Sequence, residues 1–304
     1  MVGRVFFFEW EVILMQWIQQ HIGMIGVQLA SLCSEFGEEI VMIAILGFLY
    51  WGYDKAYGKY VGINMLMALI CTVQLKSIFL RRRPYLNHEG INCLKPVSKE
   101  ADVTNLSAQG YSFPSGHSTN AAAAYGSLAA YKKKKSLWIA AIVMILLVGC
   151  SRVVVGMHYP TDVLGGWLTG GLAVAVGTVL QKKIKDQRLI YLLLILAGLP
   201  GMFFCRTEEY FTCYGIMIGA FAGFLFEEKY VNFKETEKWQ TRILRILGGM
   251  VIFLGLGVVL KLPFSKEFLE SGTFAAYLVR LCRYAVITFV DIGVYPMIFK
   301  KHEA

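Results

Sequence analysis

Apolar residues occur along this chain in long runs that short polar segments separate. A helix that spans a membrane needs about 20 mainly apolar residues, with a range of roughly 17–25. About nine runs approach this length, and they lie near residues 37–54, 57–80, 116–131, 136–155, 161–181, 189–205, 211–227, 242–260 and 273–298. The pattern therefore predicts an all-α fold, a polytopic membrane helix bundle with about nine transmembrane helices.

The N-terminal residues have a different pattern. The polar side chains of Glu9, Gln16 and Gln20 recur at helical spacing among Phe, Trp, Ile and Leu. Such a stripe is typical of a helix that lies in the membrane interface, and a short additional span is the alternative. Glu9 and Glu11 also interrupt the first apolar stretch, which argues against a signal peptide. We expect three segments: an N-terminal interfacial helix in residues 1–35, a core in residues 36–187 and C-terminal transmembrane helices in residues 188–304.

The composition supports a membrane protein. Hydrophobic residues make up 56% of the 304 residues and charged residues 17%, and the mean hydropathy is +0.53. An average soluble domain is roughly 45–50% apolar and about 25% charged. These values exclude a soluble two-domain enzyme as well as a disordered or fibrous chain. The seven cysteines are an odd number and most lie in apolar runs, so we expect buried free thiols and no disulfide framework.

The formal net charge of +9 results from 30 Lys and Arg against 21 Asp and Glu. The basic residues cluster between apolar runs, at Lys132–Lys135, at Lys182, Lys183, Lys185 and Arg188, and at Lys300 and Lys301. This arrangement is typical of short cytoplasmic loops and not of a nucleic-acid-binding surface. We therefore expect no nucleic acid partner, and we expect the other side of the membrane to hold the loops 82–115, 156–160, 206–210 and 261–272.

The loop 82–115 is long, and loops beyond about 12–15 residues without structure of their own are usually functional or disordered. A first polar cluster lies where this loop begins, with Lys76, Arg83 and Pro84 at the end of the second span. Lys76 and Arg83 are seven residues apart, so that they share one helix face and converge on one anion. For Arg81 and Arg82 we favour ordinary basic residues at the end of a span, whose side chains extend to the aqueous interface.

A second cluster opens the third span with Pro114, Ser115, Gly116 and His117. The first turn of a helix presents free backbone N–H groups and a partial positive charge, which together bind a phosphate or an oxyanion. We expect His117 at the edge of this cradle, where it can transfer a proton. The alternative for Ser115 is a simple helix cap.

A third cluster joins the fourth and fifth spans and contains Arg152, His158, Pro160 and Asp162. Pro160 suits the first turn of the fifth span. Asp162 lies four residues after His158, and we expect its carboxylate to accept a hydrogen bond from the imidazole. A carboxylate in that position fixes the tautomer of a histidine and raises its basicity. The alternative is a hydrogen-bonded helix cap.

All three clusters fall at the same predicted membrane face. They bring together three basic side chains, a helix N-terminus, two of the five histidines and a carboxylate. A tetrahedral dianion requires such surroundings: charged donors for its oxygens, an in-line nucleophile and an acid for the leaving oxygen. The sequence therefore predicts phosphoryl transfer.

In their residues and spacing, the three clusters resemble the signature motifs of the type 2 phosphatidic acid phosphatase and vanadium haloperoxidase superfamily. The resemblance implies that His158 attacks phosphorus and becomes a phosphohistidine, that Asp162 orients it, and that His117 protonates the leaving alcohol and later activates water. It also implies that the phosphoryl oxygens are held by Lys76, Arg83, Ser115, Gly116 and Arg152. No metal and no cofactor is implied, and the sequence contains no carboxylate cluster suited to a metal.

The resemblance further implies the activity. We expect an integral-membrane phosphatase that acts on a lipid phosphate monoester or pyrophosphate at the extracytoplasmic face, surrounded by membrane lipid and inhibited by phosphate or vanadate. The order of the spans also resembles that of glucose-6-phosphatase and the long-chain-base phosphate phosphatases, so a sugar phosphate is an alternative substrate. Transfer of the phosphoryl group to a lipid acceptor, and movement of a phospholipid without catalysis, are further alternatives.

For the location we favour a bacterial cytoplasmic membrane, or the endoplasmic reticulum membrane if the chain is eukaryotic. The terminal residues Lys300–Ala304 are similar to a dilysine retrieval signal but have histidine at the third-last position. For the C-terminal helices we consider a lateral lipid entry, a homodimer interface or simple completion of the bundle. Arg280, Arg283 and Asp291 lie in an apolar segment and indicate either a site or a mutually satisfied buried pair. Glu38 and Glu39 begin the first span, at the interface, and predict no site.

Overall fold

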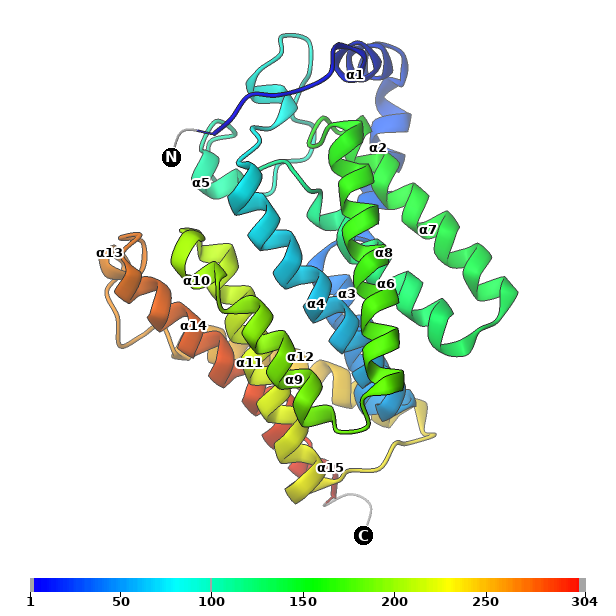
Figure 1. Cartoon of the computed structure of the whole chain (residues 1–304), viewed down its shortest axis with the longest axis vertical. Coiled ribbons are helices and arrows are strands. Elements are labelled where there is room, and N and C mark those ends of the chain that lie inside the picture. Colours follow the sequence, from blue (N-terminus) through cyan, green and yellow to red (C-terminus); the bar gives the residue numbers. More distant parts are fainter. Residues whose placement is uncertain (1–2, 99, 301–304) are drawn as a thin grey trace. The chain divides into compact units, whose positions relative to one another are not determined.

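A computed structural model describes residues 3–98 and 100–300 of the chain. Within these residues the regular secondary structure is helical (Figure 1), and extended backbone pairs in an isolated bridge between Arg4 and Arg81. The predicted all-α fold class is thereby confirmed. The side chain of Lys300 and the residues 301–304, which include the last predicted basic cluster and the terminal signal-like segment, lie outside the described part.

The chain forms two compact units. The first contains Met1–Met42 and Ile63–Val179, and the second contains Ile43–Gly62 and Leu180–Ala304. The helices that lie wholly in the first unit are α1 (Glu9–His21), α2 (Gly23–Glu35), η2 (Pro84–Leu86), α5 (Leu106–Gln109), α6 (Gly116–Lys132) and α7 (Lys135–Val154). Three helices pass from one unit to the other: α3 (Glu39–Gly47), α4 (Lys55–Phe79) and α8 (Pro160–Lys183).

The second unit contains the remaining helices. They are η1 (Phe48–Tyr53), α9 (Gln187–Gly198), α10 (Gly201–Phe204), α11 (Glu208–Phe226), η3 (Glu227–Val231), α12 (Trp239–Val259), α13 (Lys266–Leu269), α14 (Phe274–Phe289), η4 (Val290–Val294) and α15 (Met297–Lys300). The division differs from the predicted boundaries at residues 35 and 187, because residues 43–62 group with the C-terminal helices.

Seven helices within the described residues are long and apolar enough to cross a membrane: Lys55–Phe79, Lys135–Val154, Pro160–Lys183, Gln187–Phe204, Glu208–Val231, Trp239–Val259 and Phe274–Phe299. Of the two other predicted spans, residues 37–54 form the shorter apolar helix Glu39–Tyr53, and residues 116–131 form α6, which has 17 residues. The chain is thus a multi-pass membrane protein.

The low hydropathy of α6 follows from its place inside the first unit. Its alanines from Ala121 to Ala124 are buried against other helices, so that they do not need the bulk of lipid-facing residues. Helix α8 presents glycines to it: a Cβ on Gly166 would lie 2.6 Å from the carbonyl oxygen of Ser115, and one on Gly170 would lie 2.6 Å from that of Thr119. This close approach packs the N-terminal halves of α6 and α8 against each other.

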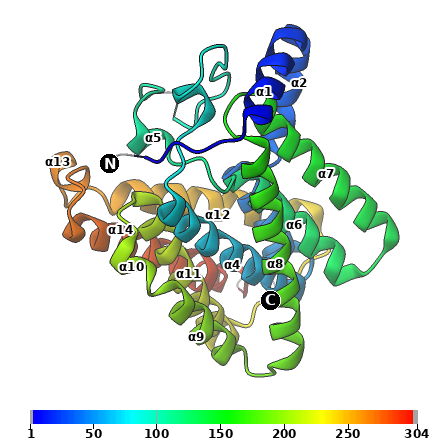
Figure 2. The same ribbon diagram turned by 45° about the horizontal axis from the view of Figure 1, so that its top comes forward.

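The N-terminal segment forms two helices where one was predicted. Gly23 has a φ of +63°, which ends α1 and starts α2 in a new direction, and α2 packs against α7 (Figure 2). The apolar side chains of Trp10, Ile13 and Trp17 are exposed on α1, as expected of a helix in a membrane interface. The buried residues of α1 are Met15 and the charged Glu11.

In the second unit, α11 packs along α14 (Figure 1). Gly215 and Gly219 of α11 permit this contact, because a Cβ at either position would collide with the backbone of α14. Residues 43–62 belong to this unit because Tyr50 packs edge-on against Phe224 and Phe233 and because Trp51 packs against Tyr295. All seven cysteines are free thiols. The predicted burial is confirmed for Cys205 and Cys213, whereas Cys150 and Cys282 are exposed and the other three are partly exposed.

Candidate functional site

His158 lies in the short connection between α7 and α8. Helix α7 ends at Val154 and α8 begins at Pro160, whose fixed φ suits a first helical turn. Gly156 makes the connection tight, because its φ is +76° and a Cβ there would collide with the carbonyl oxygen of Asn92. As a result His158 is held in the interior, with 2% of its surface exposed.

Two hydrogen bonds fix the imidazole of His158. Its Nδ1 lies 2.8 Å from the carbonyl oxygen of Ser112, and because a carbonyl only accepts, Nδ1 carries the proton. Its Nε2 lies 3.2 Å from Nη1 of Arg83, which donates, so that Nε2 is unprotonated. Burial, followed by the positive charges of Arg83, Arg152 and Lys76, lowers the pKa of His158 well below its ordinary value of 6.5. The site therefore presents a neutral imidazole whose Nε2 lone pair can act as a nucleophile.

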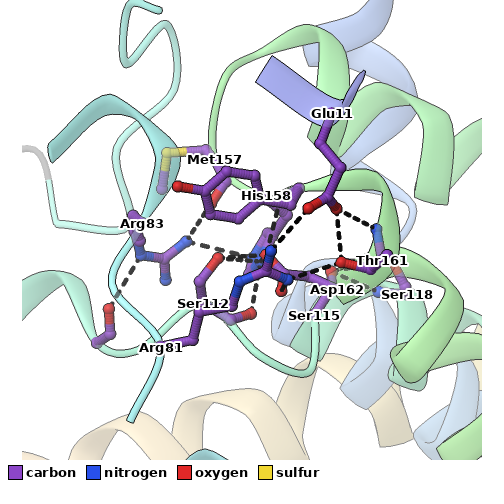
Figure 3. A network of polar contacts seen from close by, with 12 residues as sticks. Glu11, Arg81, Arg83, Ser112, Ser115, Ser118, Met157, His158, Thr161 and Asp162 are labelled. Atoms are coloured by element: carbon purple, nitrogen blue, oxygen red, sulfur yellow. Dashed lines mark hydrogen bonds and ion pairs between the residues drawn. The ribbon is translucent and has the colours of Figure 1, made fainter. Parts of the chain in front are cut away.

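Asp162 lies behind His158, although not in the direct hydrogen bond that the sequence predicts. Its Oδ2 is 3.7 Å from Nδ1 of His158, which exceeds hydrogen-bond distance. The same oxygen accepts from the backbone N–H of Tyr159 at 2.8 Å and from the hydroxyl of Ser112. Ser112 thus binds the carboxylate with its side chain and the imidazole with its carbonyl (Figure 3). Asp162 contacts His158 through Ser112, a residue that lies outside the three predicted clusters.

Arg81 is a buried member of the site, and its interpretation as a residue that extends to the interface is wrong. It is 2% exposed, and its Nη1 lies 2.6 Å from Oδ1 of Asp162. The chain turns inward before it because α4 ends at Phe79 and Leu80 has a φ of +54°. The guanidinium also lies over the ring of Tyr159, 4.0 Å from its centroid. Arg81 therefore fixes the oxygen of Asp162 that does not bind Ser112.

Glu11 joins α1 to this network. Its carboxylate is fully buried, and Oε2 lies 2.9 Å from Nη2 of Arg81. Its Oε1 accepts from the backbone N–H of Thr161 at 3.0 Å and from the hydroxyl of the same residue. Figure 3 shows the resulting chain of contacts from Glu11 through Arg81 to Asp162. The sequence indicated the contact of Glu11 with Arg81 only by placing a charged residue in an apolar stretch. Nothing in the sequence indicated that Arg81 would be its partner.

The first turn of α6 has the N-terminal geometry on which the predicted anion cradle depends. Ser115 is the N-cap residue, and its hydroxyl oxygen accepts from the backbone N–H of Ser118 at 3.4 Å and from its hydroxyl at 2.9 Å. The helix cap that is the alternative for Ser115 is therefore present. The N–H groups of Gly116 and His117 precede the first intrahelical hydrogen bonds, as in other helix N-termini that bind anions. A Cβ on Gly116 would lie 3.8 Å from Nζ of Lys76, so that the ammonium group lies beside this turn.

Arg83 and Arg152 reach the site from two different segments. Arg83 is oriented by backbone carbonyls, since its Nε bonds to those of Gln109 and Gly110 at 3.0 Å. Arg152 is buried and donates from Nη1 to the hydroxyl of Ser34. Its Nε has no hydrogen-bond partner among the described residues. A buried guanidinium with such an N–H group is well suited to bind an anion.

His117 completes the set of predicted residues. When protonated, it lowers the pKa of His158 in the same direction as the basic side chains do, and its Nε2 lies 3.1 Å from Oε1 of Glu38. The backbone N–H of Ser115 donates to the carbonyl of Asp162 at 3.0 Å, which joins α6 to α8 at this point. The structure thus gathers in the first unit all eight residues that the sequence singled out: Lys76, Arg83, Ser115, Gly116, His117, Arg152, His158 and Asp162.

The candidate residues of the C-terminal segment do not form the buried pair that we considered. Arg280 pairs with Glu208, and Arg283 donates from Nη2 to the carbonyl of Gly257 at 3.1 Å. Oδ1 of Asp291 makes no hydrogen bond with the residues that the structure describes. Among these residues there is also no group of three or more His, Cys, Asp or Glu side chains that could hold a metal ion.

Comparison with protein families gives two matches. Residues 57–186 match the model of the PAP2 superfamily, and residues 211–303 match that of the PAP2 superfamily phosphatase transmembrane extension. The first match contains the three polar clusters. The second covers much of the C-terminal unit.

Comparison with curated proteins finds three relatives of particular interest. The chain is 44% identical to phosphatidylglycerophosphatase B of Bacillus subtilis over 26% of its own length and 43% of the relative. It is 30% identical to undecaprenyl-diphosphatase of Sulfolobus acidocaldarius over 45% of its own length and 62% of the relative. It is 28% identical to undecaprenyl-diphosphatase BcrC of Bacillus subtilis over 45% of its own length and 65% of the relative. The chain spans less than two thirds of each of these relatives, and no solved structure matches it.

Proposed function

The chain belongs to the PAP2 superfamily, and from that premise we propose that it is an integral-membrane phosphatase. Its substrate is a lipid phosphate monoester or pyrophosphate, and its reaction passes through a phosphohistidine on His158 without a metal. The observation that carries the proposal is the orientation of His158: Nδ1 donates to the carbonyl of Ser112 at 2.8 Å, and Nε2 is left unprotonated among basic side chains.

In the first step, Nε2 of His158 attacks phosphorus and forms an N–P bond. The bond from phosphorus to the leaving oxygen breaks, and that oxygen departs with the bonding electron pair and takes a proton from His117. The positive charge that develops on the imidazole is stabilised by the carbonyl of Ser112 and by Asp162, whose Oδ2 lies 3.7 Å away. The non-bridging oxygens bind to the amides at the start of α6 and to the cations of Lys76, Arg83 and Arg152.

In the second step, water attacks phosphorus while His117 removes its proton. The N–P bond breaks, its electron pair returns to Nε2 of His158, and inorganic phosphate is released. Ser115 contributes as the cap that holds the first turn of α6 in place. The unpartnered Nε of Arg152 supports an anion at this position, because a buried N–H group without an acceptor is costly.

The membrane setting and the relatives support a phosphorylated lipid as the substrate. The relatives are named for phosphatidylglycerophosphate and undecaprenyl diphosphate, both of which are phosphorylated lipids. We place the site at the extracytoplasmic face of a bacterial cytoplasmic membrane, since the predicted basic clusters lie in the opposite loops. A homodimer through the C-terminal helices is compatible with this scheme.

A substrate panel tests the proposal. The detergent-purified protein is assayed for phosphate release in the presence of chelator, with phosphatidic acid, phosphatidylglycerophosphate, a polyprenyl diphosphate and glucose 6-phosphate, each beside His158→Ala. The proposal predicts release from at least one lipid and its loss in the variant. Glucose 6-phosphate as the best substrate would favour a sugar phosphatase, and no release from any compound would favour a transferase or a lipid transporter.

A further inference from the structure

The turn between α2 and α3 lies directly against His117. This turn contains Phe36, Gly37 and Glu38, and its position is fixed by a hydrogen bond from the hydroxyl of Tyr125 to the carbonyl of Phe36 at 2.8 Å. A Cβ on Gly37 would lie 3.1 Å from Cβ of His117, which is closer than ordinary packing permits. Glycine at this position therefore lets the turn approach the histidine and carries the next residue, Glu38, to its ring.

The carboxylate of Glu38 faces the ring nitrogen that the reaction uses. Its Oε1 lies 3.1 Å from Nε2 of His117, and the contact is an ion pair by distance rather than a hydrogen bond of regular angle. Catalytic hydrogen bonds are often poorly aligned in a site without substrate and tighten when it binds. Lys95 approaches the same oxygen from the loop 82–115, with Nζ at 3.4 Å. The contact with His117 and the charges of Lys95 and Arg152 lower the pKa of Glu38 to about 2, so that its carboxylate is ionised.

The surroundings of His117 disfavour its protonated form. Burial lowers the pKa of His117 to about 4, and the positive charges of Arg152 from α7 and Lys95 from the loop act in the same direction. Glu38 faces it from the turn between α2 and α3 and favours that form. A histidine that donates a proton to a leaving oxygen must carry the proton while it is surrounded by the cations that bind the phosphoryl group. The negative charge of Glu38 offsets these cations at the one ring nitrogen it touches.

We infer that Glu38 is a positioning residue that favours the protonated form of His117 and aims its Nε2 at the leaving oxygen. This inference rests on the proposed function, because it requires His117 to be the general acid. It adds a segment from outside the three sequence clusters to the reaction. Helix α2, which precedes this turn, also contacts the site directly, because Arg152 donates a hydrogen bond to Ser34 near the end of α2.

The need for a proton from His117 depends on the leaving group. An alkoxide is a poor leaving group and needs a proton from His117, whereas 4-nitrophenolate leaves without one. Loss of Glu38 should therefore slow transfer of the phosphoryl group from a lipid phosphate much more than transfer from 4-nitrophenyl phosphate. A structural defect around His158 would slow both reactions alike.

The test compares Glu38→Gln with Glu35→Gln. Glu35 is the last residue of α2, just before this turn, and pairs with Lys95 at 2.8 Å rather than with His117, so it is the matched control for loss of one carboxylate. The rate of the phosphorylation half-reaction is measured by rapid quench with short-chain phosphatidic acid and with 4-nitrophenyl phosphate. General acids contribute typically 10²–10⁴-fold, so we expect Glu38→Gln to be slower by roughly tenfold or more with phosphatidic acid and close to wild type with 4-nitrophenyl phosphate.

The pH profile gives a second readout. In Glu38→Gln the basic limb of kcat/KM for phosphatidic acid should move to lower pH, because His117 loses its proton more readily without the carboxylate. An equal loss with both substrates, or an effect no larger than that of Glu35→Gln, would overturn the inference. The variant His117→Gln distinguishes failure of this inference from failure of the proposed function. If His117→Gln slows the reactions with phosphatidic acid and with 4-nitrophenyl phosphate equally, then His117 is not the general acid and the proposed function is at fault.

Discussion

Nη1 of Arg81 lies 2.6 Å from Oδ1 of Asp162, and both side chains are almost completely buried. Their neighbour Glu11 lies 2.9 Å from Nη2 of the same guanidinium. One arginine therefore connects the N-terminal helix to the carboxylate that supports His158. The three charges come from segments far apart in the sequence, so that their contacts depend on the fold of the whole first unit.

The first prediction concerns the stability that this arginine provides. Removal of one partner from a buried ion pair costs about 3–5 kcal/mol, because the remaining charge stays buried without compensation. Arg81→Ala should lower the free energy of unfolding by about that amount. Chemical unfolding in detergent measures the change. The matched control is the half-buried neighbour Arg82→Ala, for which a loss of about 0.5 kcal/mol or less is expected. Equal effects of the two substitutions would refute the structural role of Arg81.

The second prediction concerns Glu11 and activity. Glu11→Gln keeps the shape of the side chain but removes its charge, so that Arg81 is free to shift and the support of His158 through Asp162 loosens. A displacement of about 1 Å at a reacting group can cost 10²-fold, and we expect kcat to fall by roughly 10- to 100-fold. The control is Glu9→Gln, an exposed position on the same helix, which should retain wild-type kcat. Wild-type kcat in Glu11→Gln would show that the N-terminal helix is not coupled to the site.

The third prediction concerns pH. Burial and the charge of Arg83 lower the pKa of His158 in the folded protein below its ordinary value of 6.5, so the imidazole is neutral at pH 7. The acid limb of kcat/KM should therefore lie below pH 6.5, because the nucleophile is lost only when His158 gains a proton. Between pH 6.5 and the lower pKa of the folded protein, His158 binds a proton in the unfolded state but not in the folded state. Its contribution to the free energy of unfolding is therefore present above pH 6.5 and is lost as the pH falls through the folded pKa. An acid limb above pH 7 would contradict the assignment.

The fourth prediction concerns the anion site. Vanadate resembles the transferred phosphoryl group and should inhibit competitively with the lipid substrate. Arg152→Gln removes a buried guanidinium, and a lost charge-assisted hydrogen bond of about 1.5–3 kcal/mol corresponds to an inhibition constant about 10- to 150-fold higher. The exposed Arg188→Gln serves as the control and should leave the inhibition constant unchanged. Full activity in excess vanadate would argue against an anion at this position.

The sequence predicted the parts of the site that are encoded locally. His158 and Asp162 are four residues apart, so that their spacing already indicates that they lie close together. The helix face that we predicted Lys76 and Arg83 to share does not exist, because α4 ends at Phe79 and Arg83 follows in extended backbone. The partner of Asp162 was not predictable, because Arg81 lies 81 residues earlier and its sequence neighbours are also basic. The same holds for Glu38, whose role appears only once the turn after α2 is packed against α6.

The fold was predicted to a similar extent. Long apolar runs are a local property of the sequence, and seven of the predicted runs form helices that are long and apolar enough to cross a membrane. The run 116–131 is different because α6 contacts other helices rather than lipid, and its alanines reflect that packing. The division into units depends on aromatic contacts of Tyr50 and Trp51 with distant helices, which no local pattern encodes.

The central claim is that His158 becomes phosphorylated, and trapping the intermediate tests it most directly. The purified protein is mixed with radiolabelled lipid phosphate in the presence of chelator, quenched in alkali within the first turnover and digested for mass spectrometry. We predict an acid-labile, alkali-stable phosphate on the peptide that contains His158, and none in His158→Ala. Phosphate release that continues in His158→Ala, or a label on another residue, would contradict the account.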